Sequence, residues 1–417
     1  MNSIERRLLV VSHPAVVSVN QEVYRELRRR GWDVQIVAPS RWRHSYSQAP
    51  VTPQALEGLE GSLLPVPVAF PGRPQRHVYL TRCRLLCARV RPDVAFVEAE
   101  PYALAATQWG RACRRMGVPF GVQCYENIDR SLPAPVRVLR SLVLRDAAFV
   151  AARSQTAARL AKAWGARGEV GLAPPAVPSW DSTSASHGPA LLEPLPAHSP
   201  QPSESTEPRP SPTAEPSPAE VRSDRESRGR PFAVGYAGRL IESKGLLDLL
   251  EAVRRLQAPV QMLLAGNGEL RERLEGQPIP GSHVRVLDGL THGQMPSAYA
   301  QFDVLVLPSH TTATWKEQFG RVIVEALWCG VPVLGSDSGE IPWLIELTGG
   351  GLVFPEGDVE ALTARLNDLR DSPELRRELA TRGRAAVQRL FSVPAATDQL
   401  ERLLSLDPPH KWGRSVR

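Results

Sequence analysis

Lysine is scarce in this sequence, and two of its lysines lie where other chemically capable residues gather. The 50 basic residues include four lysines: Lys162, Lys244, Lys316 and Lys411. Lys244 follows Arg239 in a segment that also contains Gly238 and Gly245. A guanidinium can hold two phosphate oxygens, and an ammonium adds a compact positive charge. The pair could neutralise a departing pyrophosphate, although a capping glycine with two solvated cations would give the same local pattern.

Two glutamates, Glu317 and Glu325, belong to the second candidate cluster. Glu317 comes after an apolar strand pattern at 304–307, and a helix is expected to begin close to Gly320. The unpaired amides at the start of a helix attract anions such as a diphosphate. Glu325 has apolar neighbours on both sides, which disfavours the alternative of a solvated helical carboxylate. We expect Glu325 to accept hydrogen bonds from paired hydroxyls such as those of ribose, and Glu317 to reach a sugar ring.

Both halves of the chain alternate strand and helix patterns, which favours an α/β fold of two doubly wound parallel sheets. In the N-terminal half, strands are expected at 8–12, 33–37, 94–97, 120–124, 148–151 and 169–172, with a helix at 21–30. In the C-terminal half, strands are expected at 233–236, 261–265, 284–287, 304–307 and 331–335, with helices at 246–256, 296–299, 320–328 and 359–369. Ligands of such sheets bind beyond the carboxyl ends of the strands. The active site is therefore expected in a cleft between two facing domains.

The segment 178–230 separates these halves. It is dense in Pro, Ser, Glu and Ala and has few large apolar residues, so it cannot bury enough surface to offset its conformational entropy. We predict a disordered linker between an N-terminal Rossmann-like domain at 1–177 and a C-terminal Rossmann-like domain at 231–393. The remaining segment, 394–417, is expected to be a helix and tail, with packing against the N-terminal domain as one option.

Composition and charge limit the classes of partner. With 42% hydrophobic and 23% charged residues, the chain is typical of an ordinary globular protein. The net charge is +12 over residues 1–177 and −3 over residues 231–417. The positive half could attract an anionic acceptor or an anionic membrane surface, or its arginines could simply be solvated. No basic run is interleaved with stacking aromatics, so nucleic acid is not an expected partner.

The cysteines and the absence of export signals bear on location. The cysteines are odd in number and lack the paired spacings of zinc sites: Cys83, Cys87, Cys113, Cys124 and Cys329. No signal-peptide pattern opens the chain, and no stretch approaches the roughly 20 apolar residues that span a bilayer. These features predict reduced thiols, no metal site and a cytoplasmic location, with peripheral contact at the inner face of the membrane as an option.

Several short motifs of the C-terminal half occur together in a fixed order. They are Gly238-Arg239 with Lys244-Gly245, Gly266-Asn267-Gly268, two glutamates with seven residues between them, Phe319-Gly320, Cys329-Gly330-Val331-Pro332-Val333 and Leu352-Val353-Phe354. The set resembles the donor-binding core of the retaining glycosyltransferases of family 4 (glycosyl transferases group 1), which have the GT-B fold. The resemblance covers roughly residues 232–390, and the N-terminal half resembles the family in outline.

The resemblance implies a role for each residue of the two clusters. Arg239 and Lys244 would hold the donor diphosphate. Glu317 would contact the transferred sugar and stabilise the developing oxocarbenium, while Glu325 would bind the ribose hydroxyls. The implied donor-binding residues are Gly238, Arg239, Lys244, Gly266, Asn267, Glu317, Phe319, Gly320, Arg321 and Glu325, and the implied catalytic residues are Glu317, Lys244 and Arg239.

The reaction that the resemblance implies is transfer of a hexosyl group from a UDP-sugar or GDP-mannose, with retention, to an acceptor hydroxyl. The acceptor would be a glycan, a lipid-linked compound or a small molecule, as in polysaccharide or glycoconjugate biosynthesis. The nucleotide sugar would be a co-substrate, with no metal and no other cofactor. Two alternatives are a GT-B epimerase or phosphorylase and a catalytically silent sugar-nucleotide-binding protein. The complete set of two cations and two acids argues against the silent protein.

Several positions depart from the family pattern. Trp328 replaces a usually small residue, and Trp343 stands where a polar or acidic residue is frequent. The family's acceptor-side histidine has no evident match. Candidates for the acceptor side rest on position alone: Asn20, Glu98, Glu126 and Asn127, with His13 and Glu100 nearby in the same strand-end loops.

Overall fold

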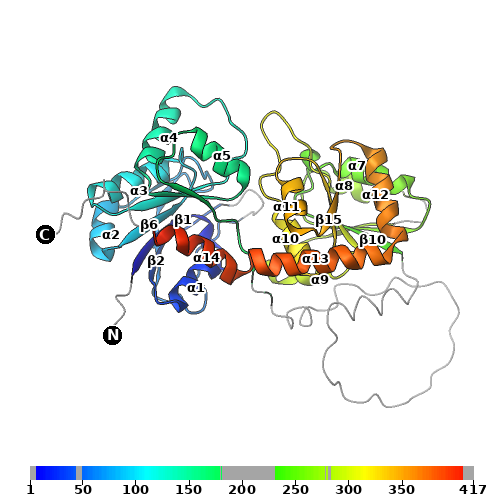
Figure 1. The fold of residues 1–417 in the computed structure, drawn as a ribbon, viewed down its shortest axis with the longest axis horizontal. Coiled ribbons are helices and arrows are strands. Elements are labelled where there is room, and N and C mark those ends of the chain that lie inside the picture. The colour runs from blue at the N-terminus through cyan, green and yellow to red at the C-terminus, as the bar shows by residue number, and fades with distance from the viewer. Residues whose placement is uncertain are drawn as a thin grey trace, which may run out of the picture.

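The computed structural model describes residues 6–43, 49–178, 180, 231–277, 279 and 283–406. In this part of the chain, two α/β domains lie side by side (Figure 1). The two doubly wound parallel sheets predicted from the sequence are confirmed. The linker predicted at 178–230 lies outside the described residues, apart from Pro178 and Trp180.

The N-terminal sheet has seven parallel strands in the order β3-β2-β1-β6-β7-β8-β9. Its strands are β1 Arg7–Ser12, β2 Asp33–Pro39, β3 Leu63–Val66, β6 Val94–Glu98, β7 Phe120–Cys124, β8 Phe149–Ala152 and β9 Glu169–Leu172. A small hairpin of β4 (Val68–Ala69) and β5 (Val78–Tyr79) forms a separate two-stranded sheet. The strand order reverses between β1 and β6, and such switch points open the crevice in which ligands bind.

Helices cover both faces of this sheet. One apolar core receives α2 (Cys83–Val90), α3 (Leu104–Arg115), α4 (Ala134–Asp146) and α5 (Gln155–Ala163). Helices α1 (Glu22–Arg29) and α14 (Val393–Leu404), the latter from the C-terminal end of the described chain, pack into a second apolar core. The strands β1, β6, β7 and β8 are buried almost throughout. Parallel strands covered on both faces need such continuous apolar runs, which is why they were readable in the sequence.

The C-terminal sheet has six parallel strands in the order β12-β11-β10-β13-β14-β15. Its strands are β10 Phe232–Ala237, β11 Val260–Ala265, β12 His283–Leu287, β13 Val304–Leu307, β14 Val333–Ser336 and β15 Gly351–Phe354. Its helices are α7 Leu246–Arg255, α8 Arg271–Glu275, α9 Met295–Tyr299, α10 Arg321–Trp328, α11 Ile341–Thr348, α12 Val359–Asp371 and α13 Pro373–Phe391. The order reverses between β10 and β13, so the loops after these two strands meet at the switch point.

The last helices join the two domains. Helix α13 runs along the C-terminal domain, and α14 continues from it onto the N-terminal domain beside α1 (Figure 1). Arg30, directly after α1, pairs with Asp398 at 2.6 Å and Glu401 at 2.8 Å, and Trp32 Nε1 donates to Glu401 at 2.8 Å. These bonds attach the predicted 394–417 segment to the N-terminal domain as far as residue 406. Residues 407–417 lie outside the described part.

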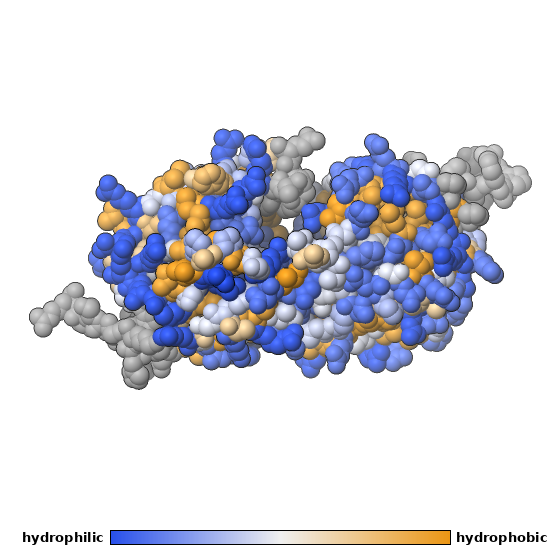
Figure 2. Space-filling model, turned by 90° about the horizontal axis from the view of Figure 1, so that it is seen from above, coloured by the Kyte–Doolittle hydropathy of each residue, from blue (hydrophilic) through white to orange (hydrophobic). Residues whose placement is uncertain are grey.

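Every strand and helix predicted above is present within two residues of its expected bounds. Those not predicted include β3, β4 and β5, which are short and partly exposed. Pro65 and Pro67 interrupt the segment of β3 and β4, and prolines argue against a strand assignment from sequence. Seen from above in Figure 2, hydrophobic residues come to the surface of the N-terminal half in patches bordered by hydrophilic ones. Within the described ranges, no helix has the length and apolar character needed to cross a bilayer.

Candidate active site

A buried ion pair joins the loops that follow β10 and β13. Lys244 Nζ lies 2.6 Å from Glu317 Oε2, and Ser309 Oγ donates to the same oxygen at 3.0 Å. The Lys244 ammonium also lies 4.4 Å from the ring centre of Trp315, within the range of a cation–π contact. The side chains of Lys244 and Glu317 are 12% and 11% exposed. The structure therefore brings together two residues that the sequence placed in separate clusters.

Glycines allow these loops to approach one another closely. Gly245 has a φ of 66°, and a Cβ at this position would lie 1.8 Å from the carbonyl oxygen of Pro308. Gly266 has a φ of 152°, and its Cβ would lie 1.9 Å from the carbonyl oxygen of Gly238. The amide of Gly238 in turn donates to Ala265 at 2.9 Å. Only glycine permits both the backbone conformation and the contact, so these glycines shape the loops around the ion pair.

Arg239 lies in the loop after β10 and is exposed. Its guanidinium has no hydrogen bond or ion pair with any residue that the structure describes, and its carbonyl accepts a hydrogen bond from the Tyr236 hydroxyl at 2.7 Å. Burial raises the pKa of Tyr236; the charge of Glu317 raises it further, whereas the charge of Arg239 lowers it. Both charges therefore lie near one phenol. Asn267 is exposed as well, and its Oδ1 accepts from the amide of Gly268 at 2.7 Å.

Helix α10 begins directly after the Glu317 loop. Gly320 precedes its first residue with a φ of 72°, and the amides of Phe319 and Gly320 donate to no described residue. The ring of Phe319 is buried against Trp343 at 6.4 Å and Phe391 at 5.8 Å, so Trp343 has a packing role. Trp328 packs against the core of the same domain. The free amides at the positive end of the helix suit an anion.

Glu325 has partners different from those of Glu317. The hydroxyl of Tyr299 donates to Glu325 Oε2 at 2.8 Å, and Arg321 Nε lies 3.0 Å from Oε1. Burial raises the pKa of Glu325, and the charge of Arg321 and the bond from Tyr299 oppose that rise. The structure thus holds Glu325 and Arg321 as a second ion pair, without contact to the Lys244–Glu317 pair. A ribose that reaches Glu325 has to share Oε1 with Arg321 or displace it.

Two acceptor-side candidates touch the C-terminal domain. Asn127 Nδ2 donates to the carbonyl oxygen of Glu317 at 2.7 Å, while Asn127 Oδ1 is buried without a described partner. Arg321 Nη1 donates to Asn20 Oδ1 at 3.4 Å, and Asn20 Nδ2 donates to Pro14 at 2.9 Å. These contacts bring the strand-end loops of the N-terminal domain next to the predicted donor residues.

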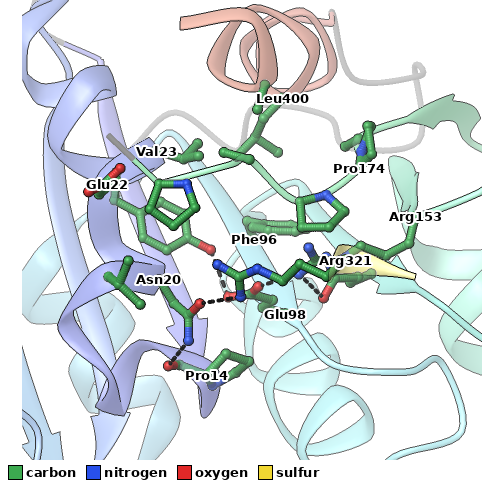
Figure 3. Close-up of a pocket in the computed structure, with 18 residues that line it drawn as sticks. Pro14, Asn20, Glu22, Val23, Phe96, Glu98, Arg153, Pro174, Arg321 and Leu400 are labelled. Carbon is green, nitrogen blue, oxygen red and sulfur yellow. Dashed lines mark hydrogen bonds and ion pairs between the residues drawn. The ribbon is translucent and has the colours of Figure 1, made fainter. Parts of the chain in front are cut away.

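Two cavities of about 280 and 260 Å³ lie between the domains. They share five lining residues: Pro14, Gln123, Arg153, Pro175 and Arg321. Figure 3 shows Arg153 and Arg321 extending into the second cavity from opposite domains, with Arg321 pointing toward Asn20. Gln318 and Phe319, which directly follow Glu317, line the first. The two cavities are therefore lined by residues that directly follow Glu317 and by two guanidinium groups, while Lys244 and Glu317 themselves do not line them.

Glu98 lines the second cavity, but its carboxylate is fully engaged. Ser12 Oγ donates to Glu98 Oε2 at 2.5 Å and the Tyr24 hydroxyl donates to it at 2.8 Å. Arg153 Nη2 donates to Oε1 at 2.9 Å and to Gln123 Oε1 at 3.2 Å. Burial and the neighbouring Glu98 raise the pKa of Tyr24. Glu98 thus orients Arg153 in the cavity.

Two more acids lie together at the end of β7. Glu126 Oε2 accepts from the Tyr102 hydroxyl at 3.1 Å and pairs with Arg130 at 3.2 Å. Glu100 Oε1 accepts from the amides of Tyr125 at 2.6 Å and Glu126 at 2.8 Å, while its Oε2 is buried without a described partner. Burial raises the pKa of Glu100 to about 8. The Glu100 carboxyl is therefore protonated in the folded protein at neutral pH.

This raised pKa predicts a contribution to the pH dependence of stability that Glu100→Gln should remove. In the unfolded chain Glu100 ionises near its usual value of 4.5, so folding takes up a proton between that pH and about 8. The free energy of unfolding should therefore fall as pH rises through this window, by at most about 1.4 kcal/mol per pH unit. Glu100→Gln has no proton to lose and keeps an acceptor oxygen. Urea unfolding measured at pH values near both ends of this window gives the free energy of unfolding at each pH. This free energy should fall less with rising pH in Glu100→Gln than in the wild type.

The control for this experiment is Glu374→Gln, which removes an exposed acid of α13. It should retain the wild-type slope. Equal slopes for wild type and Glu100→Gln would show that Glu100 does not bind a proton on folding.

Several side chains around the site carried no individual signal in the sequence. Tyr299 and Arg153 come from elements remote in sequence from the acids they contact. Glu340, in the loop after β14, donates its amide to Glu317 at 3.1 Å, and its Oε1 is buried without a described partner. Ser309 lies close to Glu317 in sequence, and its place directly after Pro308 at the end of β13 could have indicated it.

The described ranges contain no group of three His, Cys, Asp or Glu residues that could hold a metal ion. In the same ranges all five cysteines are free thiols. Metal-free chemistry stays a prediction, which rests on the cationic groups that the site supplies.

Comparisons with known proteins match each domain separately. Residues 219–386 match the family model described as Glycosyl transferases group 1, and residues 15–175 match the model described as Glycosyl transferase 4-like domain. A solved structure of Anabaena Alr3699/HepE in complex with UDP superposes with a TM-score of 0.64 over 96% of this chain and 99% of that one, at 18% identity. The fold is GT-B.

Curated relatives resemble part of this GT-B chain. The 2-deoxystreptamine N-acetyl-D-glucosaminyltransferase of Streptomyces fradiae is 34% identical over 192 residues, which are 44% of this chain and 43% of the relative. A second relative is the GDP-mannose-dependent monoacylated alpha-(1-6)-phosphatidylinositol monomannoside mannosyltransferase of Corynebacterium glutamicum. It is 30% identical over 176 residues, which are 41% of this chain and 46% of the relative. The matches thus span about half the length of these relatives.

Proposed function

We propose that this chain is a glycosyltransferase that moves a hexosyl group from a nucleotide-diphosphate sugar to an acceptor hydroxyl. The observation that carries the proposal is the 2.6 Å pair of Lys244 and Glu317 at the switch point of the C-terminal sheet. Free amides at the start of α10 directly follow the Glu317 loop, and the exposed Arg239 lies in the same loop after β10 as Lys244. Together they supply the charges that a sugar diphosphate requires.

In the proposed reaction the bond between the sugar C1 and the diphosphate oxygen breaks, and the acceptor oxygen bonds to C1. The electron pair of the broken bond stays on the diphosphate, whose added charge Lys244 and Arg239 stabilise. The acceptor proton passes to the departing phosphate oxygen on the same face of the sugar, which gives retention. Glu317 faces the developing positive charge of the sugar ring, and Asn127 fixes its loop through the bond to the Glu317 carbonyl.

The proposed donors are UDP-sugars or GDP-mannose, and the proposed process is polysaccharide or glycoconjugate biosynthesis in the cytoplasm. The complex of the structural neighbour with UDP supports a uridine donor, while one relative is named for its use of GDP-mannose. The names of the two curated relatives give acceptors of different kinds, an aminocyclitol and a glycolipid. The acceptor class is accordingly proposed as a glycan, a lipid-linked compound or a small molecule.

A panel of nucleotide sugars tests the proposal by thermal stabilisation. A ligand that binds the folded state raises the melting temperature by an amount set by its concentration over its Kd. We expect one UDP-sugar or GDP-mannose to raise it more than the others, and the same compound to be hydrolysed slowly without acceptor. If no nucleotide sugar shifts the melting temperature, the proposal fails. Stabilisation without hydrolysis or transfer to any tested acceptor would favour the silent binding protein instead.

Removal of metal ions should leave sugar transfer unchanged. Two cationic side chains and the amides of α10 meet the charge of the diphosphate, so no divalent ion is required. Transfer measured after dialysis against EDTA should match that of the untreated enzyme. Loss of activity on chelation, with recovery when Mg²⁺ or Mn²⁺ is added, would contradict the metal-independent mechanism.

A further inference from the structure

Two stretches of the N-terminal domain carry many arginines and no acids. Residues 61–92 and 101–125 contain nine arginines and no Asp, Glu or Lys. Arg114 pairs with Asp146, and the other eight form no ion pair within the part of the chain that the structure describes. Within the described residues their charge meets no neutralising acid, so it is available to an anionic partner.

Four of these arginines line an open groove along α2 and α3, with a volume of about 980 Å³. They are Arg82, Arg84, Arg111 and Arg115. The apolar lining residues include Leu85, Ala88, Leu104, Met116 and Leu139. Thr107 also lines the groove, and its hydroxyl is buried without a described partner. The groove thus offers an apolar surface, unpaired cations and an unused hydrogen-bonding group.

Large apolar side chains of α2 and of the residues that directly follow β4 and β5 are exposed to solvent. Leu85 of α2 is 60% exposed, Leu80 directly after β5 is 62% exposed, and Phe70 directly after β4 is 63% exposed. Phe70 has a φ of 56°, a backbone conformation that bulky residues rarely adopt. Val78 of β5 lines the groove, so the hairpin and the groove adjoin. Exposed apolar side chains on neighbouring elements indicate a surface that interacts with a membrane or another apolar partner.

An anionic phospholipid bilayer has both anionic groups and an apolar interior, which match the arginines and the apolar side chains of this surface. Its phosphates bind guanidinium groups, and its acyl chains accept apolar side chains a short distance below. The long arginine stems can lie along apolar surface while their charged ends stay at the lipid phosphates. Single-stranded nucleic acid matches less well, because it binds through stacked aromatics between cations, and Phe70 is the one aromatic among the three most exposed apolar side chains of this surface.

We propose that α2, α3 and the β4–β5 hairpin form a docking face for the surface of an anionic phospholipid membrane. In the docked state the arginines contact lipid phosphates, Phe70, Leu80 and Leu85 enter the acyl region, and the groove receives a lipid chain. This docking goes beyond the proposed function, since it requires no nucleotide sugar and no transfer. Its success or failure is therefore separate from that of the glycosyltransferase proposal.

Vesicle co-sedimentation of the full chain tests the docking face. The chain should bind vesicles that contain phosphatidylglycerol, bind phosphatidylcholine vesicles far less, and dissociate as salt is raised. Loss of two arginines lowers partitioning about 30-fold, at about 1 kcal/mol for each, so R84Q/R111Q should show this loss and R84E/R111E a larger one. Leu85→Ser should weaken binding as well, because it removes the apolar contribution.

The matched control is R273E/R389E, which makes the same charge change at two exposed arginines of the C-terminal domain. It should bind as the wild type does, and the melting temperature of each variant reports its fold. Equal binding to both kinds of vesicle, or equal losses in the control and in R84E/R111E, would overturn the proposal. Competition by single-stranded RNA, together with no effect of Leu85→Ser, would identify a polyanion surface and would overturn it too.

Discussion

Lys244→Ala should lower the rate of sugar transfer about 100- to 1,000-fold, the effect of deleting one group that stabilises developing negative charge. The Lys244 ammonium is held in position by Glu317 and the Trp315 ring. Charge on the leaving group grows as the bond breaks, and the loss should therefore fall mainly on kcat rather than on KM. Steady-state kinetics with the donor found in the nucleotide-sugar panel measures both constants.

The same substitution affects folding, and a second substitution separates the two effects. Without Lys244 the buried carboxylate of Glu317 keeps, among the described residues, the Ser309 hydroxyl as its one side-chain partner, and an unpaired buried charge is destabilising. Adding Glu317→Gln removes that charge. The double variant should regain melting temperature relative to Lys244→Ala and remain inactive.

Lys162→Ala, at an exposed lysine of α5, is the matched control and should behave as wild type. A Lys244→Ala enzyme with near wild-type turnover would remove Lys244 from the mechanism. The same conclusion would follow if Glu317→Gln restored activity along with stability.

The sequence predicted the central strands because of how parallel sheets are covered. Strands such as Val304–Leu307 and Phe120–Cys124 are buried on both faces, so most of their residues are apolar and the pattern is visible in one sequence. The hairpin of β4 and β5 is two residues on each side and partly exposed. The residues of this hairpin do not need to be apolar on both faces, and no periodic pattern in the sequence predicts the hairpin.

The sequence predicted where the site residues lie in the fold, but not which side chains they contact. Glycines, cations and acids at strand ends located the Lys244 and Glu317 loops, since the carboxyl ends of parallel strands meet at one edge. The partners come from distant parts of the chain: Asn127 binds the Glu317 carbonyl across the two domains, and Tyr299 reaches Glu325 from α9. Such pairings depend on the tertiary arrangement, which leaves no local trace in the sequence.

Glu98 shows the same limit on the acceptor side. Its place at the end of β6 suggested a residue that faces the acceptor, yet Ser12, Tyr24 and Arg153 converge on its carboxylate. These three residues come from β1, α1 and the loop after β8. Arg153, oriented by Glu98, extends into the interdomain cavity together with Arg321 (Figure 3), and its position carried no signal in the sequence.

Glu325→Gln should weaken nucleotide binding about 10- to 100-fold, since hydrogen bonds to a charged group contribute about 1.5–3 kcal/mol. The amide keeps the shape of the side chain and one acceptor oxygen for the Tyr299 hydroxyl, but it loses the negative charge that ribose hydroxyls would share with Arg321. Calorimetric titration of UDP and GDP into the variant and the wild type measures the change. Unchanged affinity for both nucleotides would exclude Glu325 from the ribose site.

The unliganded Glu325→Gln protein should be about as stable as the wild type, which distinguishes a binding defect from a folding defect. Burial raises the pKa of Glu325, so the folded state disfavours its ionised form, and a neutral isostere relieves that cost. Arg321 loses its acidic partner but keeps the hydrogen bond to Asn20 Oδ1, and its side chain, which is 36% exposed, can turn to water. Tyr299→Phe is the matched control: it removes the bond to Oε2, leaves a buried carboxylate oxygen unpaired, and should lower the melting temperature while retaining nucleotide affinity. Glu325→Gln should thus lose nucleotide affinity and keep its stability, whereas Tyr299→Phe should lose stability and keep its affinity. This pair of results is expected only if the charge of Glu325 contributes to ligand binding rather than to folding.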